Sequence, residues 1–155
     1  MEASYKDTSK KKWKNVIPHR KDVYFEAATL FKKYMVLEEK KDGLPLIRII
    51  DRTSKKSFLI PFADSSYTAT VTSNAEFESQ VVRYEFESLR LPESTFDFDM
   101  VTRKQELKKT RQIPNYNPEN YRTERIWVKA RDGKKVPISL LMKKDFKPTG
   151  QNPLS

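Results

Sequence analysis

The chain has 155 residues and a formal net charge of +10, with 37% hydrophobic and 34% charged residues. It contains no cysteine, which excludes disulfides, thiolate metal sites and cysteine nucleophiles. The most apolar stretch, residues 44–50, includes Pro45 and Arg48 and is too short to cross a bilayer. These properties predict one ordinary domain or two small units, and we expect a cytoplasmic protein without a membrane partner.

The charge is distributed unevenly along the chain. Residues 1–56 and 111–155 are net basic, whereas residues 57–110 are net acidic. The densest basic run consists of Lys6, Lys10, Lys11, Lys12 and Lys14. A basic excess can attract nucleic acid, but it is more typical of a solvated surface. Binding of nucleic acid is therefore an alternative that rests on charge alone.

Strand patterns dominate the first two thirds of the chain. Short alternating runs with turn residues between them predict antiparallel strands at residues 33–39, 46–52, 56–62, 67–71, 80–88 and 94–100. In residues 73–79, Ser73 stands three positions before Glu76, which is a capping-box pattern. That segment predicts a single helical turn.

An internal repeat organises these strands. RIIDRTSKKSFL (48–59) and FDFDMVTRKQEL (96–107) align without gaps, 48 residues apart. In both segments a strand ends in aspartate, Asp51 or Asp99, and a basic polar turn leads to another short strand. Each unit is expected to contain a strand, a loop, a strand, a tight turn and a strand. Repeats of 40–50 residues made of consecutive antiparallel strands are typical of propeller blades.

The C-terminal part predicts a separate β-hairpin. Residues 111–123 are rich in proline and asparagine and are typical of an extended connector. Residues 124–142 follow as two alternating runs around an Asp132–Gly133 turn. Their apolar positions are Ile126, Val128, Ala130, Val136, Ile138, Leu140 and Met142. Because a lone hairpin is marginally stable in water, we expect its apolar face to need a partner.

The sequence shows no catalytic motif. Gly43, Gly133 and Gly150 lie too far apart for a phosphate-binding loop, and no serine stands in a G-x-S-x-G elbow. His19 is the only histidine, and the motif IPHRKD offers it neither a nucleophile nor an orienting acid. We interpret His19 as a surface or loop residue. We predict no catalytic, cofactor-binding or metal-ligating residue and no cofactor.

Three pairs of neighbouring carboxylates could in principle carry out acid–base chemistry: Glu38/Glu39, Glu85/Glu87 and Asp97/Asp99. Carboxylates on exposed faces and edges of sheets also keep such sheets soluble, and we favour this structural interpretation. Phe96 and Phe98 are flanked by aspartates, which argues against a platform for stacking nucleic-acid bases in that strand.

Three stretches taken together resemble the prolyl oligopeptidase family of serine peptidases, and its oligopeptidase B (protease II) branch in particular. Residues 17–51 (IPHRKD…IRIID) look like a late propeller segment, and residues 60–100 (IPFADSS…FDFDM) look like the next blade. Residues 121–144 (YRTERIWVKARDGKKVPISLLMKK) are similar to the first strands of the hydrolase domain. Ala130–Leu140 is the most specific part of the resemblance, which runs from about Trp13 to Lys144.

The resemblance implies a mainly β fold, with antiparallel sheets like two propeller blades and then a hairpin that starts an α/β-hydrolase domain. The expected units are a basic N-terminal extension (1–12), a partial propeller (13–110), a connector (111–123) and the hairpin of a truncated peptidase domain (124–155). Oligopeptidase B cuts short peptides after basic residues, and its propeller gates access. The Ser, Asp and His of the family's triad follow the matched region.

The chain is therefore expected to be a non-catalytic fragment of an oligopeptidase B-like peptidase, inactive alone. Its expected partners are the rest of the peptidase or another copy bound through exposed blade faces, with peptide substrate only in the complete enzyme. The alternative is a small basic β-rich binding module, for a complementary peptidase chain or, as the less favoured case, nucleic acid.

Overall fold

The computed structural model describes residues 1–147 and 149–150. Residues 148 and 151–155, part of the expected peptidase segment, lie outside the described residues. The elements, in chain order, are η1 (Lys10–Lys12), β1 (Tyr24–Leu30), β2 (Tyr34–Lys41), β3 (Leu44–Asp51), β4 (Ser57–Leu59), β5 (Tyr67–Val71), β6 (Val81–Ser88), β7 (Ser94–Asp99), β8 (Gln105–Thr110), η2 (Pro118–Asn120), β9 (Tyr121–Lys129) and β10 (Lys135–Lys143).

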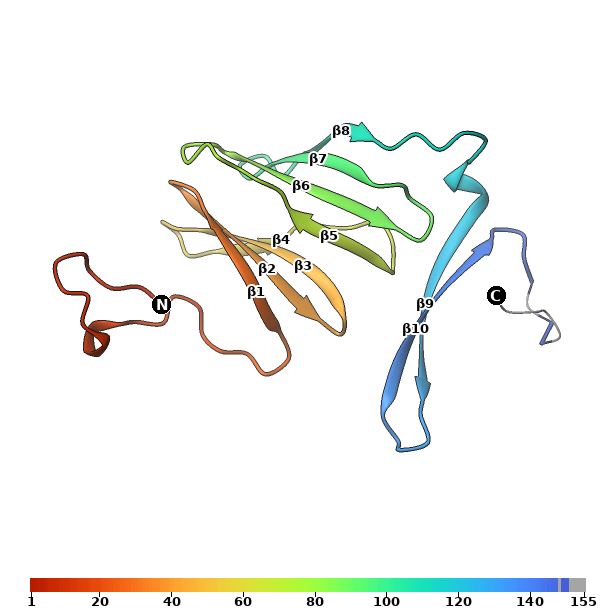
Figure 1. The fold of residues 1–155 in the computed structure, drawn as a ribbon, viewed down its shortest axis with the longest axis horizontal. Coiled ribbons are helices and arrows are strands. Elements are labelled where there is room, and N and C mark those ends of the chain that lie inside the picture. The colour runs from red at the N-terminus through yellow and green to blue at the C-terminus, as the bar shows by residue number, and fades with distance from the viewer. Residues whose placement is uncertain (148, 151–155) are drawn as a thin grey trace.

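Two four-stranded antiparallel sheets form the body of the molecule (Figure 1). The first sheet has the order β1-β2-β3-β4 and the second has the order β5-β6-β7-β8, so every neighbour in a sheet is also the next strand in sequence. The hairpin β9–β10 follows as a separate two-stranded sheet. The prediction of a mainly β, antiparallel fold is confirmed.

Two details differ from the sequence prediction. Each sheet has four strands rather than the three of the predicted repeat unit, and β1 was missed because its side chains are mostly exposed and alternate weakly. The helical turn predicted at residues 73–79 is wrong. The Asn74 amide instead donates to the Thr72 and Arg83 carbonyls and accepts from the Arg83 N–H, which holds this segment as a loop beside β6.

The hydrophobic core lies between the two sheets. Val36 and Ile49 of the first sheet and Val82 and Phe98 of the second are almost fully buried in it. Burial raises the pKa of Tyr84 to about 12, so this phenol stays neutral and donates a hydrogen bond to Gln105 Oε1 at 3.1 Å. Each fully buried side chain of this size contributes about 1.5–3 kcal/mol, so the sheets stabilise each other chiefly through this layer.

The outer faces of the two sheets differ in polarity. Leu30, Met35 and Ile50 are register neighbours across β1, β2 and β3, and they line a groove of ≈ 760 Å³ on the outer face of the first sheet. The outer face of the second sheet instead carries Arg83, which binds both carboxylate oxygens of Asp97 at 2.7 and 2.8 Å. The first sheet therefore has an apolar patch on its outer face, beside the Glu39–Arg48 ion pair, in addition to its apolar inner face.

The predicted repeat appears as two equivalent turns. Oδ1 of Asp51 accepts the N–H groups of residues 53 and 54, and Oδ1 of Asp99 accepts those of residues 101 and 102, all at 2.8 Å. Lys55 and Arg103, the corresponding residues that end these turns, both have positive φ, at 60° and 59°. In each turn the aspartate side chain therefore accepts hydrogen bonds from two backbone N–H groups that have no backbone acceptor there.

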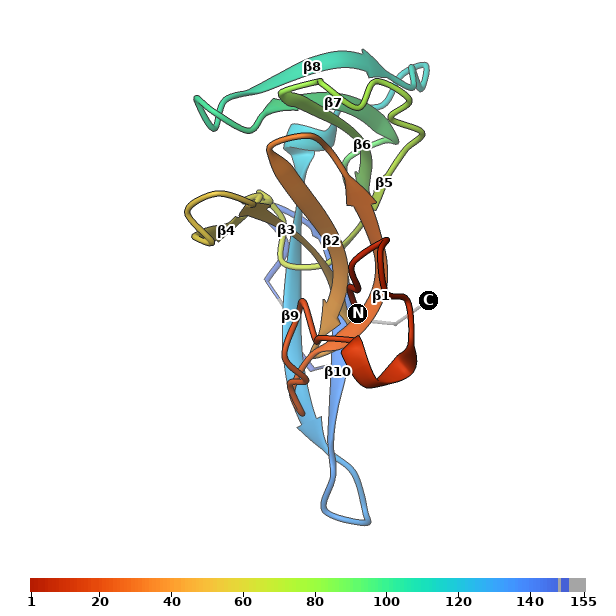
Figure 2. The same ribbon diagram turned by 90° about the vertical axis from the view of Figure 1, so that its left-hand side faces the viewer.

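The C-terminal hairpin is confirmed, with Val128 opposite Val136 and a turn around Asp132–Gly133. Gly133 has φ +83°, a conformation that favours glycine. The turn projects beyond both sheets in two perpendicular views (Figures 1 and 2). Ile126 and Ile138 share one face of the hairpin with these valines, and all four side chains are exposed by 39–46%.

We expect Phe98→Ala to lower the free energy of unfolding by about 3–5 kcal/mol, because it empties space in the layer between the sheets. Phe77→Ala is the matched control, since Phe77 is 52% exposed, and its effect should stay below about 1 kcal/mol. Urea denaturation followed by circular dichroism measures both values. Equal losses in the two variants would contradict the location of the core.

The Asp99 turn should be sensitive to acid. The N–H groups of Thr102 and Val101 hold the pKa of the Asp99 carboxyl below its ordinary value. A lowered folded-state pKa contributes stability above the unfolded-state pKa, and this contribution is lost as the pH falls through the folded-state value. The urea midpoint of wild type should therefore exceed that of Asp99→Asn at pH 7, and the difference should shrink below pH 4. A difference that does not change with pH would refute this assignment.

Candidate functional site

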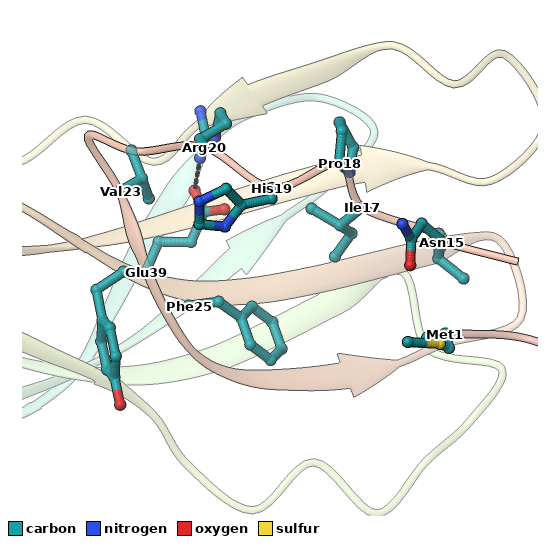
Figure 3. Close-up of a pocket in the computed structure, with 11 residues that line it drawn as sticks. Met1, Asn15, Ile17, Pro18, His19, Arg20, Val23, Phe25 and Glu39 are labelled. Carbon is teal, nitrogen blue, oxygen red and sulfur yellow. Dashed lines mark hydrogen bonds and ion pairs between the residues drawn. The ribbon is translucent and has the colours of Figure 1, made fainter.

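A pocket of ≈ 500 Å³ lies under the segment that precedes β1 (Figure 3). Asn15–Arg20 cross the outer face of the first sheet, and Phe25 and Glu39 form the opposite wall. His19 lies in an exposed loop at the rim of this pocket. Its lining contains no serine or threonine, so His19 has no aliphatic hydroxyl beside it to activate.

The carboxylate of Glu39 is the charged centre of this pocket. Its side chain is only 3% exposed, and it accepts hydrogen bonds from Arg20 at 2.8 Å and from Arg48 at 2.5 and 3.0 Å. Arg48 is largely buried, whereas Arg20 comes from the exposed loop of His19. Glu39 therefore attaches the preceding segment to β2 and β3, and both of its oxygens are already occupied by cations.

The other carboxylates considered from the sequence also have structural partners. Glu38 points to the opposite face of β2 and accepts the N–H of Val71, so it does not act as a pair with Glu39. Asp97 binds Arg83 and Asp99 caps its turn, as described above. Glu87 accepts from the Thr68 hydroxyl at 3.3 Å, and Glu85 is exposed on the same outer face. These contacts agree with the structural interpretation of the three pairs.

The basic run near the N-terminus forms an exposed turn. Lys10–Lys12 make up η1, and the Trp13 indole N–H donates to the Thr8 carbonyl at 2.9 Å. Backbone bonds between Glu2 and Lys14 close this loop at its base. The aromatic side chains beside these lysines are Tyr5 and Trp13, which are 89% and 46% exposed. The Trp13 indole is held against its own loop, so the run presents charge rather than a groove of stacked rings.

A second polar site joins the hairpin to the second sheet, and sequence reasoning missed it. Asp64 is 9% exposed and accepts from the Ser88 hydroxyl at 2.5 Å, from Arg90 Nε at 2.9 Å and from the Thr123 hydroxyl at 3.4 Å. Arg90 also contacts Glu119, which in turn binds Lys144. The burial of Asp64 was not visible in the sequence, where residues 63–66 lie between two predicted strands.

The hairpin also touches the first sheet. Arg125 donates to the carbonyl of Asp42 in the β2–β3 turn and stacks over Trp127, with its guanidinium 5.6 Å from the ring centre. Asp42 and Gly43 both have positive φ, as a tight two-residue hairpin turn requires. A Cβ on Gly43 would lie only 3.2 Å from the Arg125 guanidinium. Gly43 therefore allows both the positive φ of the turn and the close approach of Arg125 from the hairpin.

Within residues 1–147 and 149–150, no group of three His, Cys, Asp or Glu side chains could hold a metal ion. In the same part of the chain, no helix is both long and apolar enough to span a membrane.

Comparisons with known proteins point to one group of peptidases. The profile described as prolyl oligopeptidase, N-terminal β-propeller domain, matches residues 1–111. Dipeptidyl aminopeptidase BI of Pseudoxanthomonas mexicana is 32% identical over 148 residues, which cover 95% of this chain and 20% of that protein. Protease 2 of Moraxella lacunata is 25% identical over 141 residues, which cover 90% of this chain and 20% of that protein.

A solved structure gives the same result. Oligopeptidase B from Trypanosoma brucei, in a closed form with covalently bound antipain, has a TM-score of 0.74 and 25% identity. The match covers 84% of this chain and 20% of that chain. The present chain thus spans about 20% of the length of the relatives that it matches.

We expect Glu39→Ala to lower the free energy of unfolding by about 3–5 kcal/mol, because it leaves the buried Arg48 without its carboxylate. Glu106→Ala is the matched control, since Glu106 pairs with Lys108 while 71% exposed, and its cost should stay below about 1 kcal/mol. Chemical denaturation of both variants provides the comparison. A loss no greater at Glu39 than at Glu106 would show that Glu39 is not a structural anchor.

Proposed function

Because this chain belongs to the prolyl oligopeptidase family, we propose that it supplies the last two propeller blades and the first strands of the peptidase domain to a serine peptidase. The observation that carries the proposal is where the profile match ends. It stops at Arg111, one residue after β8, and the chain then continues through a connector into a separate hairpin.

The proposed units keep the limits expected from the sequence: extension 1–12, partial propeller 13–110, connector 111–123 and peptidase hairpin 124–155. Four-stranded antiparallel sheets stacked face to face are the repeating unit of a propeller, which supports the assignment of two blades. A hairpin with Ile126 and Val136 exposed on one face supports the assignment of a strand pair that packs on a larger peptidase body.

The chain contributes no catalytic group in this proposal. His19 lies on a loop without a nucleophile beside it, and Glu39 is held by two arginines. The Ser, Asp and His of the triad belong to the rest of the peptidase, which is the proposed partner of this chain. What the chain provides is part of the wall that controls access to the active site and part of the seat of the peptidase domain.

The finer features of the proposal come from the resemblance to oligopeptidase B. These are hydrolysis of short peptides after arginine or lysine, gating of entry by the propeller, and a cytoplasmic location. Likeness to Oligopeptidase B from Trypanosoma brucei supports the choice of this branch. The apolar groove formed by Leu30, Met35 and Ile50 supports a further blade packed on the first sheet.

A chimera tests the proposal. Residues 1–147 replace the matching segment of dipeptidyl aminopeptidase BI from Pseudoxanthomonas mexicana, and hydrolysis of that enzyme's peptide substrates is measured. We expect the chimera to be active and Val136→Asp to lower its activity by about tenfold or more, because a charge would be buried at the hairpin seat. Val101→Asp is the matched control, since Val101 is 54% exposed in the β7–β8 turn, and it should retain activity.

The isolated chain is assayed beside the chimera with a short arginyl peptide, and no turnover is expected. Turnover that persists through repurification of the isolated chain would overturn the proposal. Equal loss of activity in Val136→Asp and Val101→Asp would overturn the assignment of the hairpin face.

A further inference from the structure

We propose that Glu119 is a positioning residue that acts as the release point of an electrostatic latch between the second sheet and the hairpin. The latch consists of Asp64, Arg90, Glu119 and Lys144, which come from the β4–β5 loop, the β6–β7 turn, η2 and the position directly after β10. The inference concerns a junction within this chain, and it does not depend on the proposed function.

The first half of the latch is a buried anchor. The Asp64 side chain is 5% exposed and that of Arg90 is 17% exposed, and Nε of Arg90 lies 2.9 Å from Oδ1 of Asp64. Ser88 reinforces this pair by donating its hydroxyl to Oδ2 of Asp64. Because one charge would be left buried if the pair parted, this half should remain closed under ordinary conditions.

The second half is an exposed link. Oε1 of Glu119 lies 3.3 Å from Nη1 of Arg90, and Oε2 lies 3.1 Å from Nζ of Lys144. The Glu119 side chain is 68% exposed, so water and salt reach both contacts. Arg90 is thus shared between one buried and one exposed carboxylate, and the exposed one is the weaker partner.

Breaking the Arg90–Glu119 contact would free η2 and the hairpin together, because the two are joined to each other. The N–H of Lys144 donates to the Asn120 carbonyl at 2.9 Å, so η2 and the end of β10 belong to one unit. Of the ion pairs among the described residues, Arg90–Glu119 is the one that crosses from the sheets to this unit. Hydrogen bonds from neutral hydroxyls and from Arg125 also cross the junction.

Loss of the exposed link should therefore widen the range of hairpin orientations without unfolding the sheets. Because the chain has no native cysteine, thiols introduced at two exposed positions can be spin-labelled specifically. Lys104→Cys in the β7–β8 turn and Lys134→Cys in the hairpin turn report the distance between the second sheet and the hairpin tip. Double electron–electron resonance on the full chain gives the distribution of this distance.

In this labelled background we expect Glu119→Gln to raise the population outside the main distance peak by about two- to fivefold at low salt. Wild type should approach the same distribution at 1 M salt, whereas Glu119→Gln should respond little to salt. Glu78→Gln is the matched control. Glu78 is 67% exposed and pairs with Lys32 away from the hairpin, so this variant should behave like wild type.

Three outcomes would overturn the latch. These are a Glu119→Gln distribution identical to wild type at low salt, equal broadening in Glu78→Gln, and a wild-type distribution that does not change with salt. The last measurement needs no Glu119 variant, so it decides the matter even where Glu119→Gln fails to fold. A fourth outcome, retained salt sensitivity in Glu119→Gln, would also overturn the latch, because the salt effect would then belong to another contact.

Discussion

The apolar contact between the two sheets is the interaction on which the rest of the structure depends. Each sheet alone is a four-stranded meander with an exposed apolar face, and neither would be stable with that face in water. Val36 and Ile49 from one sheet and Tyr84 and Phe98 from the other close this layer almost completely. Because the layer fixes the sheets relative to each other, it also fixes the β2–β3 turn and the β4–β5 loop, which the hairpin contacts.

The outer faces of the two sheets differ in how much apolar surface they expose. The first sheet continues the apolar packing on its far side, where the preceding segment covers part of the groove around Met35. The second sheet ends in a polar face with the Arg83–Asp97 pair. The first sheet therefore has apolar surface on its outer face for a further packing partner, and the second sheet presents a charged outer face.

Buried charges mark the places where other segments join the sheets. The Glu39 carboxylate binds Arg20 of the preceding segment. The Asp64 carboxylate binds Thr123 of the hairpin directly, and it also binds Arg90, which contacts Glu119 of η2. Both acids are buried, and both are satisfied by several donors, as the cost of an unpaired buried charge requires. At both places directional contacts to a buried carboxylate fix where the joined segment meets the sheets.

Most strands and both kinds of turn followed from the sequence alone. Alternation placed β2 to β7, and the internal repeat placed β8. The repeated aspartates Asp51 and Asp99 identified equivalent turns, and Asp132–Gly133 located the hairpin. Only the tertiary structure decided that β1 completes the first sheet, that residues 73–79 form a loop, and that Asp64 is buried. The loop at 73–79 and the burial of Asp64 depend on contacts with Arg83 and Arg90, which local sequence patterns do not reveal. β1 escaped prediction because its mostly exposed side chains give a weak alternation.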